Sequence, residues 1–148
     1  AAVIQCVIGG PEQGQELVRH EGVNGVLFTG SANSGVAIAR KLAGRPDKLL
    51  TLEMGGNNPI VCWDTPKITD AAALIVQSAF ASAGQRCTAA RRLIIKDTMY
   101  DSVMTEVKAL ADRIIFGAPF DEPSPFMGPM IDNFAADGLN DSFFYLLS

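Results

Sequence analysis

The chain has few of the residues that build disulfide frameworks, zinc sites and histidine-based catalytic centres. Its 148 residues include 3 cysteines and 1 histidine. Cys6, Cys62 and Cys87 are widely spaced and form no Cys-x-x-Cys pair, which indicates free thiols in a reducing compartment rather than disulfides or a bound metal ion. His20, the single histidine, ends a predicted helix, where a capping role is favoured over catalysis. The sequence therefore predicts no metal site.

The chain also lacks a long hydrophobic run and an excess of positive charge. No apolar run approaches the ~20 residues that a membrane-spanning helix needs, and the opening stretch AAVIQCVIGG shows no basic leader or cleavage pattern. The 12 Lys and Arg residues are outnumbered by 16 Asp and Glu residues, for a net charge of -4. Such a balance offers no overall basic surface to a phosphate backbone. We therefore expect a cytoplasmic protein with neither a membrane nor a nucleic-acid partner.

The first part of the chain alternates short apolar runs with segments of helical spacing. The runs Val3–Ile8, Val26–Phe28 and Leu49–Leu52 predict strands, and residues 11–20 and 32–43 predict helices. Apolar strands joined by helices of this length form parallel sheets covered by helices, so the predicted fold class is α/β. Because the first residue is not Met and the first run already resembles a strand, we expect the chain to begin inside a longer protein.

The pattern continues through the second part of the chain. Pro59–Cys62 and Arg92–Lys96 predict strands, whereas Ile68–Ser82 and Thr98–Arg113 predict helices. The Pro- and Gly-rich stretch GAPFDEPSPFMGP, residues 117–129, predicts a loop.

A run of small residues lies where the predicted strand GVLFT, residues 25–29, leads directly into a helix. It consists of Gly30, Ser31, Ala32, Asn33, Ser34 and Gly35. Small residues at such a junction let a ligand approach the backbone, and the free N–H groups of a helix start attract a phosphate. The spacing is neither that of a dinucleotide fingerprint nor that of a P-loop. A plain Ser-capped helix after a strand is the competing interpretation.

Two further residues carry candidate chemistry. Glu53 leaves an apolar strand just before Gly55 and Gly56, where partial desolvation would raise the pKa of its carboxyl group and suit it to act as a general base. An ion pair with a neighbour such as Lys48 is the alternative. Cys87, in SAGQRCTAAR, follows a Gly-containing bend that could direct backbone N–H groups at an oxyanion. The alternative interpretation of Cys87 is a buried, unreactive thiol. We assign Cys6 and Cys62 to the core.

Three motifs in order resemble the aldehyde dehydrogenase superfamily: Phe28–Ser31, Leu52–Pro59 and Gly84–Thr88. The resemblance extends from Val3 to about Asp132. The residues of its motifs are most similar to those of semialdehyde dehydrogenases of arginine degradation. It implies an aldehyde dehydrogenase-like α/β fold. Residues 1–54 would be the C-terminal half of a Rossmann-type NAD-binding domain, and residues 55–148 the N-terminal part of the catalytic domain.

The resemblance also implies a reaction. Cys87 would be the nucleophile, Glu53 the general base, and Gly30–Gly35 would face the pyrophosphate of NAD, with Ser31 as a side-chain contact. The substrate would be a small aldehyde, and the longer parent a homo-oligomer. The family's oxyanion asparagine, ribose lysine and Glu-x-Phe-Gly-Pro segment are missing, and the ending NDSFFYLLS departs from the expected Ala-rich helix. We therefore expect the chain to be a middle section of a longer enzyme, with little or no activity alone. The alternatives are a dehydrogenase for another semialdehyde, a non-catalytic protein and a nucleotide-binding regulator.

Overall fold

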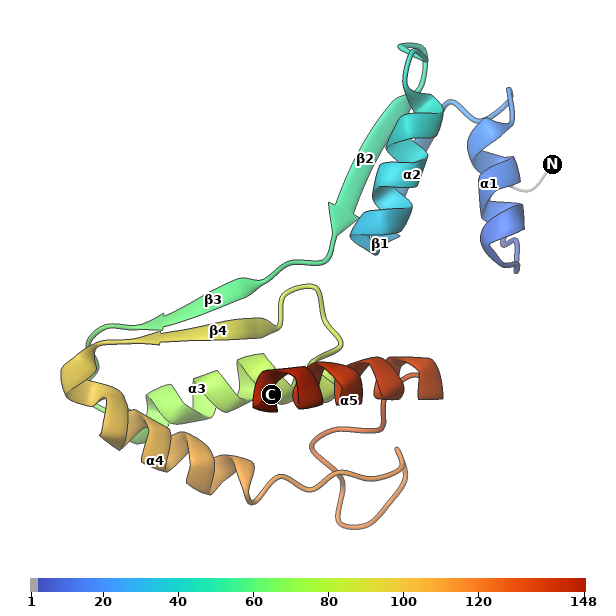
Figure 1. Cartoon of the computed structure of the whole chain (residues 1–148). Helices are drawn as coiled ribbons and strands as arrows, with labels where there is room; N and C mark the ends of the chain where they lie inside the picture. Colours follow the sequence, from blue (N-terminus) through green and yellow to red (C-terminus); the bar gives the residue numbers. More distant parts are fainter. Residues whose placement is uncertain (1–2) are drawn as a thin grey trace. The chain divides into compact units, whose positions relative to one another are not determined.

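The computed structural model describes residues 3–148, which divide into two compact units separated between Gly55 and Gly56. Each unit contains two parallel strands joined by a helix (Figure 1), which confirms the predicted α/β class. The elements of the first unit are α1 (Pro11–Arg19), β1 (Gly25–Gly30), α2 (Ala32–Leu42) and β2 (Leu49–Met54). The predicted helices and the second and third predicted strands of this part are therefore confirmed.

The first unit is a strand–helix–strand layer in which α2 covers one face of the strand pair. β1 and β2 run parallel, in register from Gly25 opposite Leu49 to Gly30 opposite Met54. Phe28 and Met54 face the start of α2, where a Cβ on Gly35 would come within 4 Å of both side chains. Side chains alternate along a strand, so Leu27, which is 78% exposed, lies on the other face.

The prediction of a buried strand at Val3–Ile8 is wrong. The segment has no regular secondary structure, and its large side chains are exposed, from 61% at Val7 to 100% at Val3. Cys6 is exposed as well, so its assignment to the core is also wrong. The physical reason is that a strand needs a neighbouring ladder, and among residues 3–148 β1 pairs with β2 and no strand pairs with this segment.

The second unit repeats the strand–helix–strand arrangement and adds two helices. Its regular elements are β3 (Asn58–Cys62), α3 (Ile68–Phe80), β4 (Ala90–Ile95), α4 (Tyr100–Ala111) and α5 (Asn133–Leu147), with short 3-10 turns at Ala81–Gly84 and Asp97–Met99. The four elements predicted between residues 59 and 113 are therefore confirmed to within a few residues. Residues 117–129 form neither helix nor strand, as predicted.

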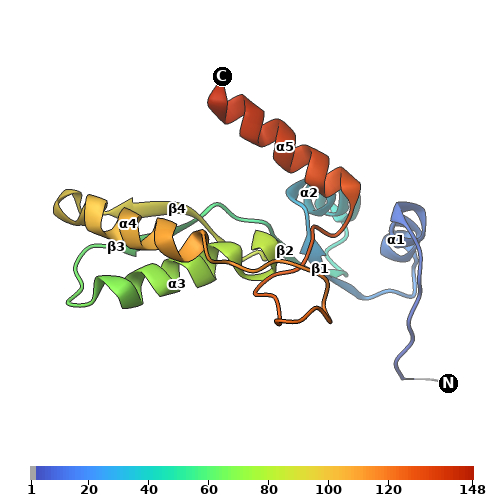
Figure 2. The same ribbon diagram turned by 90° about the horizontal axis from the view of Figure 1, so that it is seen from below.

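The core of the second unit lies between the strand pair and two helices. Cys62, Ile75 and Val103 are buried together, which confirms Cys62 as a core residue. Side chains from both strands and both helices pack around them, because α3 contacts both β4 and α4. Figure 2, seen from below, shows α3 and α4 running alongside β3 and β4. The remaining members are Ile60, Ile68, Ala71, Leu93, Ile95, Met99 and Val107.

The C-terminal residues form a capped helix. The Asp132 side chain accepts a hydrogen bond of 2.8 Å from the Ala135 N–H and so begins α5. The helix buries none of its residues, and the rings of Phe143 and Phe144 meet edge to face with centroids 5.8 Å apart. Across the described residues, no helix combines the length and the apolar character that crossing a bilayer requires.

Candidate active site

The segment Gly30–Gly35 joins the carboxyl end of β1 to the start of α2. Ser31 is the N-cap of α2: its Oγ accepts a hydrogen bond of 3.2 Å from the Ser34 N–H and donates one of 3.0 Å to Ser34 Oγ. The interpretation of this segment as a Ser-capped helix start is thus confirmed. Ala32 and Asn33 occupy the first turn, where backbone N–H groups have no partner inside a helix. Both residues are exposed and stand at a helix start, a position that attracts anions.

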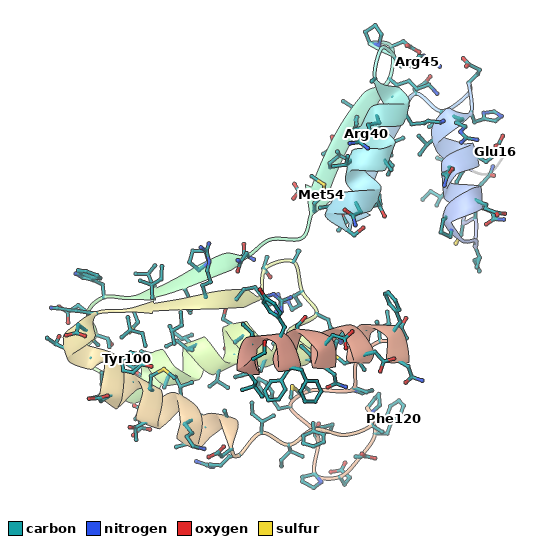
Figure 3. All side chains as sticks on the ribbon, in the orientation of Figure 1. Glu16, Arg40, Arg45, Met54, Tyr100 and Phe120 are labelled. Atoms are coloured by element: carbon teal, nitrogen blue, oxygen red, sulfur yellow. The ribbon has the colours of Figure 1, made fainter. Side chains whose placement is uncertain are left out.

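Gly35 has a packing role that the motif alone did not reveal. It is buried, and a Cβ at this position would lie 2.5 Å from Met54 Sδ and 3.0 Å from Met54 Cγ. The absence of a side chain therefore lets the first turn of α2 rest on the end of β2, near the labelled Met54 of Figure 3. Gly35 holds the helix start against the strand from which Glu53 projects.

Glu53 lies on the open face of the first unit. The register pairs Thr29 with Glu53 and Gly30 with Met54, which places Glu53 beside the residue that opens the Gly30–Gly35 segment. The structure therefore brings these two predicted features together at the carboxyl ends of parallel strands, where α/β proteins bind ligands. Glu53 is exposed, however, so the expected desolvation is not found. The reason is its strand position: its neighbours Leu52 and Met54 point to the covered face, and Glu53 does not.

The alternative partner of Glu53 is occupied elsewhere. Lys48 is 8% exposed, and its Nζ donates a hydrogen bond of 2.7 Å to the backbone carbonyl of His20. Among the ion pairs of the described residues, none involves Glu53. His20 is the C-cap of α1, as predicted, and its Nδ1 accepts a hydrogen bond from the Gly22 N–H. The ion-pair interpretation of Glu53 with Lys48 is therefore not supported.

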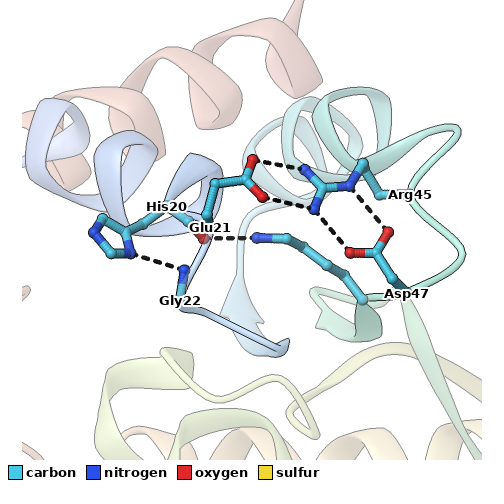
Figure 4. A network of polar contacts seen from close by, with 6 residues as sticks. His20, Glu21, Gly22, Arg45 and Asp47 are labelled. Atoms are coloured by element: carbon cyan, nitrogen blue, oxygen red, sulfur yellow. Dashed lines mark hydrogen bonds and ion pairs between the residues drawn. The ribbon is translucent and has the colours of Figure 1, made fainter.

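A charged cluster around this lysine fixes the loop before β2. Figure 4 shows the Arg45 guanidinium between two carboxylates, at 3.2 Å from Glu21 and 2.8 Å from Asp47. The hydrogen bond from Arg45 lowers the pKa of Asp47 from 3.8 to about 2, because it stabilises the ionised carboxylate. The same carboxylates raise the pKa of Arg45. The cluster contains none of the predicted site residues, and its ion pair between Arg45 and Glu21 joins the segment after α1 to the loop before β2.

Cys87 lies in a tight turn of the second unit. The Ala89 N–H donates a hydrogen bond of 3.1 Å to the Arg86 carbonyl, so Cys87 and Thr88 are the two central residues of the turn. The thiol is free and exposed, which rules out the interpretation of Cys87 as a buried thiol. No hydrogen bond within residues 3–148 occupies the Cys87 N–H. An accessible sulfur and a free backbone donor thus belong to the same residue.

The backbone leading to this turn is left-handed for three residues. Ser82, Ala83 and Gly84 have φ values of 57°, 54° and 68°. This conformation costs roughly 1–3 kcal/mol for a residue other than glycine. The Arg91 side chain stabilises it by donating a hydrogen bond of 2.8 Å to the Gly84 carbonyl. Strain of this kind concentrates at functional segments, and here it ends three residues before Cys87.

An irregularity at the start of β4 places Arg91. Asn58 pairs with Ala90, whereas Pro59 pairs with Arg92, so Arg91 is an extra residue in the ladder. Pro59 has no N–H to donate, which makes such a bulge inexpensive at this position. Arg92 reaches back across the pair, donating hydrogen bonds of 3.2 and 2.9 Å to the Asn57 carbonyl. Both arginines are exposed, and each uses its guanidinium to bind a backbone carbonyl near the start of β3 or before the Cys87 turn.

Two polar residues beside Cys87 escaped the sequence analysis. Asn58 Nδ2 donates hydrogen bonds to the backbone carbonyls of Cys87 at 2.7 Å and Ala89 at 3.3 Å. Gln85 Oε1 accepts one of 2.9 Å from the Ile131 N–H. Both residues stand in motifs, as the second asparagine of GGNNP and the glutamine of GQRC. The available signal was a polar side chain in a motif that contains glycine, but the hydrogen-bond partners of both residues include groups distant in sequence.

Comparison with known proteins identifies the family. The profile described as "Aldehyde dehydrogenase family" matches residues 1–143. The chain belongs to the aldehyde dehydrogenase family. It is 73% identical over 148 residues to the N-succinylglutamate 5-semialdehyde dehydrogenase of Novosphingobium aromaticivorans, covering 100% of this chain and 31% of that protein. The chain thus spans about a third of the length of this relative.

Solved aldehyde dehydrogenase structures share the fold. The NAD-dependent aldehyde dehydrogenase from Sinorhizobium meliloti superposes with a TM-score of 0.83 at 29% identity, over 89% of this chain and 26% of that one. The NADP-dependent glyceraldehyde-3-phosphate dehydrogenase from Bacillus halodurans, complexed with NADP, gives a TM-score of 0.77 at 31% identity, over 86% and 26%. The predicted aldehyde dehydrogenase-like fold is therefore confirmed.

Within this aldehyde dehydrogenase chain, the described residues offer no group of three or more His, Cys, Asp or Glu side chains placed to hold a metal ion. A hollow of about 550 Å³ lies along α3 and the segment after α4, lined by residues that include Val76, Leu110 and Phe126, but not by Cys87. The chemistry that remains is that of an exposed thiol with a free N–H in one unit, and a carboxylate beside a helix start in the other.

Proposed function

We propose that this chain carries the nucleophile and the general base of an NAD-dependent oxidation of N-succinylglutamate 5-semialdehyde to N-succinylglutamate, a step of arginine degradation. The observation that carries the proposal is the state of Cys87, an exposed free thiol whose backbone N–H has no hydrogen-bond partner among residues 3–148. The name of the relative that is 73% identical supports the choice of substrate.

The proposed reaction begins at sulfur. The Cys87 thiolate attacks the aldehyde carbon and forms a thiohemiacetal, and the negative charge on oxygen is stabilised by the Cys87 N–H. A bound nicotinamide cofactor supplies the hydride acceptor. The acyl group then remains on Cys87 as a thioester. Glu53 deprotonates a water molecule, which attacks this thioester, releases the carboxylic acid and regenerates the Cys87 thiolate.

The cofactor assignment rests on the start of α2. Exposed first-turn residues and the Ser31 cap offer N–H and hydroxyl donors of the kind that a pyrophosphate requires, so the residues fit the group. We accordingly propose that residues 1–54 are the C-terminal half of the NAD-binding domain and residues 55–148 the N-terminal part of the catalytic domain. NAD rather than NADP is part of the proposal, as are a homo-oligomeric assembly and a cytoplasmic location of the full-length protein.

The first test compares the three thiols of one molecule. Iodoacetamide labelling at pH 7, followed by mass spectrometry of the peptides, should modify Cys87 at least ~10-fold faster than exposed Cys6, a difference of ~1.4 kcal/mol in barrier. Buried Cys62 is the unreactive control. Repeating the measurement with NAD tests whether the cofactor protects or activates Cys87. Equal labelling of Cys87 and Cys6 would contradict an activated nucleophile.

The second test addresses the substrate. In the full-length form of the protein, NADH production from N-succinylglutamate 5-semialdehyde should exceed that from unsuccinylated glutamate 5-semialdehyde, as judged by kcat/KM. Cys87→Ser should abolish both activities, and Glu53→Gln should slow release of the acid while leaving the first acylation of Cys87 intact. A higher kcat/KM for another semialdehyde would contradict the proposed substrate but not the proposed mechanism.

A further inference from the structure

The turn that carries Cys87 has one peptide group whose orientation is not fixed by the turn itself. In a four-residue turn from Arg86 to Ala89, the closing hydrogen bond fixes the outer peptides. The central peptide, which joins Cys87 to Thr88, can face either way, and the two orientations are the type I and type II turns. A side chain that binds this peptide therefore determines the backbone conformation at Cys87, the proposed nucleophile.

The structure has the orientation of a type I turn. Type II requires a positive φ at the second central residue, which is Thr88. In residues 3–148, the residues other than glycine with positive φ are Ser82 and Ala83, so Thr88 is on the negative side. A β-branched residue strongly resists positive φ, so Thr88 itself opposes the reversal.

Asn58 opposes the reversal from the other end of the same peptide. Its Nδ2 lies 2.7 Å from the Cys87 carbonyl oxygen and 3.3 Å from that of Ala89. Asn58 is the first residue of β3 and is half-buried, so its side chain starts from a fixed point of the strand pair. Reversal of the peptide would turn the Cys87 carbonyl away from this donor and break the shorter hydrogen bond.

We propose that Asn58 is a positioning residue of the aldehyde-oxidising site, which holds the Cys87–Thr88 peptide in one orientation. The functional meaning of this placement rests on the proposed function, whereas the placement itself does not. With the Cys87 carbonyl held by Asn58, the Thr88 N–H points to the opposite side of the turn, because the two groups of a trans peptide are antiparallel. Reversal would put a carbonyl oxygen where that N–H now lies and would repel a developing oxyanion.

The experiment separates the two features that hold the peptide. Thr88→Gly removes the steric barrier and leaves Asn58. The double variant N58L/T88G removes both while keeping the branched shape of the side chain at position 58. The readout is NMR of the labelled chain. A type I turn gives a strong cross-peak between the Cys87 and Thr88 amide protons, whereas a type II turn gives one between the Cys87 Hα and the following amide proton.

We expect T88G to keep the type I pattern and N58L/T88G to shift the ratio of the two orientations by about fivefold toward type II, the equivalent of ~1 kcal/mol for one hydrogen bond. The matched control is R92L/T88G, which loses the hydrogen bonds to the Asn57 carbonyl but keeps Asn58. The control should resemble T88G alone.

Three results would overturn the proposal: a full shift in T88G, no further shift in N58L/T88G, or an equal shift in the R92L control. Cross-peaks between β3 and β4 verify that each variant is folded. Should the glycine variants unfold, Thr88→Asn replaces them in the same comparison, because asparagine tolerates a positive φ better than most residues that carry a Cβ. In the full-length form, N58L should lower kcat for aldehyde oxidation with little change in KM. If the full-length wild type does not oxidise the aldehyde but the NMR shifts are those expected above, the proposed function is refuted and the placement of Asn58 stands.

Discussion

The side chain of Gln85 accepts a hydrogen bond of 2.9 Å from the backbone N–H of Ile131, a residue 46 positions further along the chain. Its amide nitrogen donates to the carbonyls of Ser82, at 3.2 Å, and Pro129, at 3.3 Å. One side chain therefore ties the segment before α5 to the backbone that precedes Cys87.

This relationship predicts the outcome of two substitutions at Gln85. Gln85→Glu keeps the acceptor for Ile131 and loses the donor to Ser82 and Pro129, whereas Gln85→Leu loses both. We expect a stability loss of about 1 kcal/mol for Glu and about 2 kcal/mol for Leu in urea unfolding. Hydrogen exchange of the Ile131 amide should accelerate in the Leu variant alone. Equal acceleration in both variants would contradict the assigned geometry.

The left-handed residues before Cys87 give a pair of opposite predictions. Gly84→Ala should destabilise the second unit by about 1–2 kcal/mol, because φ is 68° and the new Cβ would lie 3.0 Å from the Ala79 carbonyl oxygen. Ala83→Gly, one residue earlier, should stabilise it by up to ~1 kcal/mol, since glycine accepts φ of 54° without strain. Thermal unfolding followed by circular dichroism measures both. Destabilisation by Ala83→Gly would contradict the left-handed backbone at residue 83.

The ion pair of Arg45 predicts an acid-dependent stability of the first unit. The folded-state pKa of Asp47 is about 2, below its ordinary value of 3.8. The contribution of its carboxylate is therefore complete above pH ~4 and is lost as the pH falls toward 2. Carboxyl carbon NMR should give this low titration midpoint, and Arg45→Met should return it toward 3.8. An unchanged midpoint in the Met variant would exclude Arg45 as the cause.

The cap of α2 predicts a difference between two serines. Ser31→Ala removes the oxygen that accepts from the Ser34 N–H and should cost about 1 kcal/mol. Ser34→Ala leaves that backbone donor and its acceptor in place, so it should cost a few tenths of a kcal/mol at most. Hydrogen exchange of the α2 amides distinguishes them. If Ser31 also contacts a cofactor, Ser31→Ala should weaken NAD binding in the full-length form more than Ser34→Ala does.

Sequence patterns predicted most of the fold because its elements are local. Short runs of three to five residues and helical spacing identified β1, α2, β2 and the elements from β3 to α4. The failure at Val3–Ile8 has a clear cause: an apolar run shows only that a strand is possible, whereas its formation depends on a neighbouring strand. The same limit applied to Cys6, whose burial was inferred from that run.

The candidate site was predicted in part. The motifs located Cys87, Glu53 and Gly30–Gly35, and the structure places the last two together at the carboxyl edge of β1 and β2. The exposure of Glu53 could not be read from the sequence, because it depends on which face of the strand pair α2 covers. The contacts of Asn58 likewise depend on the bulge at Arg91, which sets the Cys87 turn beside the start of β3.

The small size of the two sheets affects how readily the protein aggregates. Each sheet in the described part of the chain has two strands, so every strand is an edge strand with a row of backbone groups open to another chain. The open faces add apolar side chains, with Leu27 78%, Leu49 62% and Val61 59% exposed. Exposed edges of this kind template intermolecular pairing and aggregation. Because such pairing needs two molecules to meet, the time for which a purified sample stays dispersed should shorten as its concentration rises.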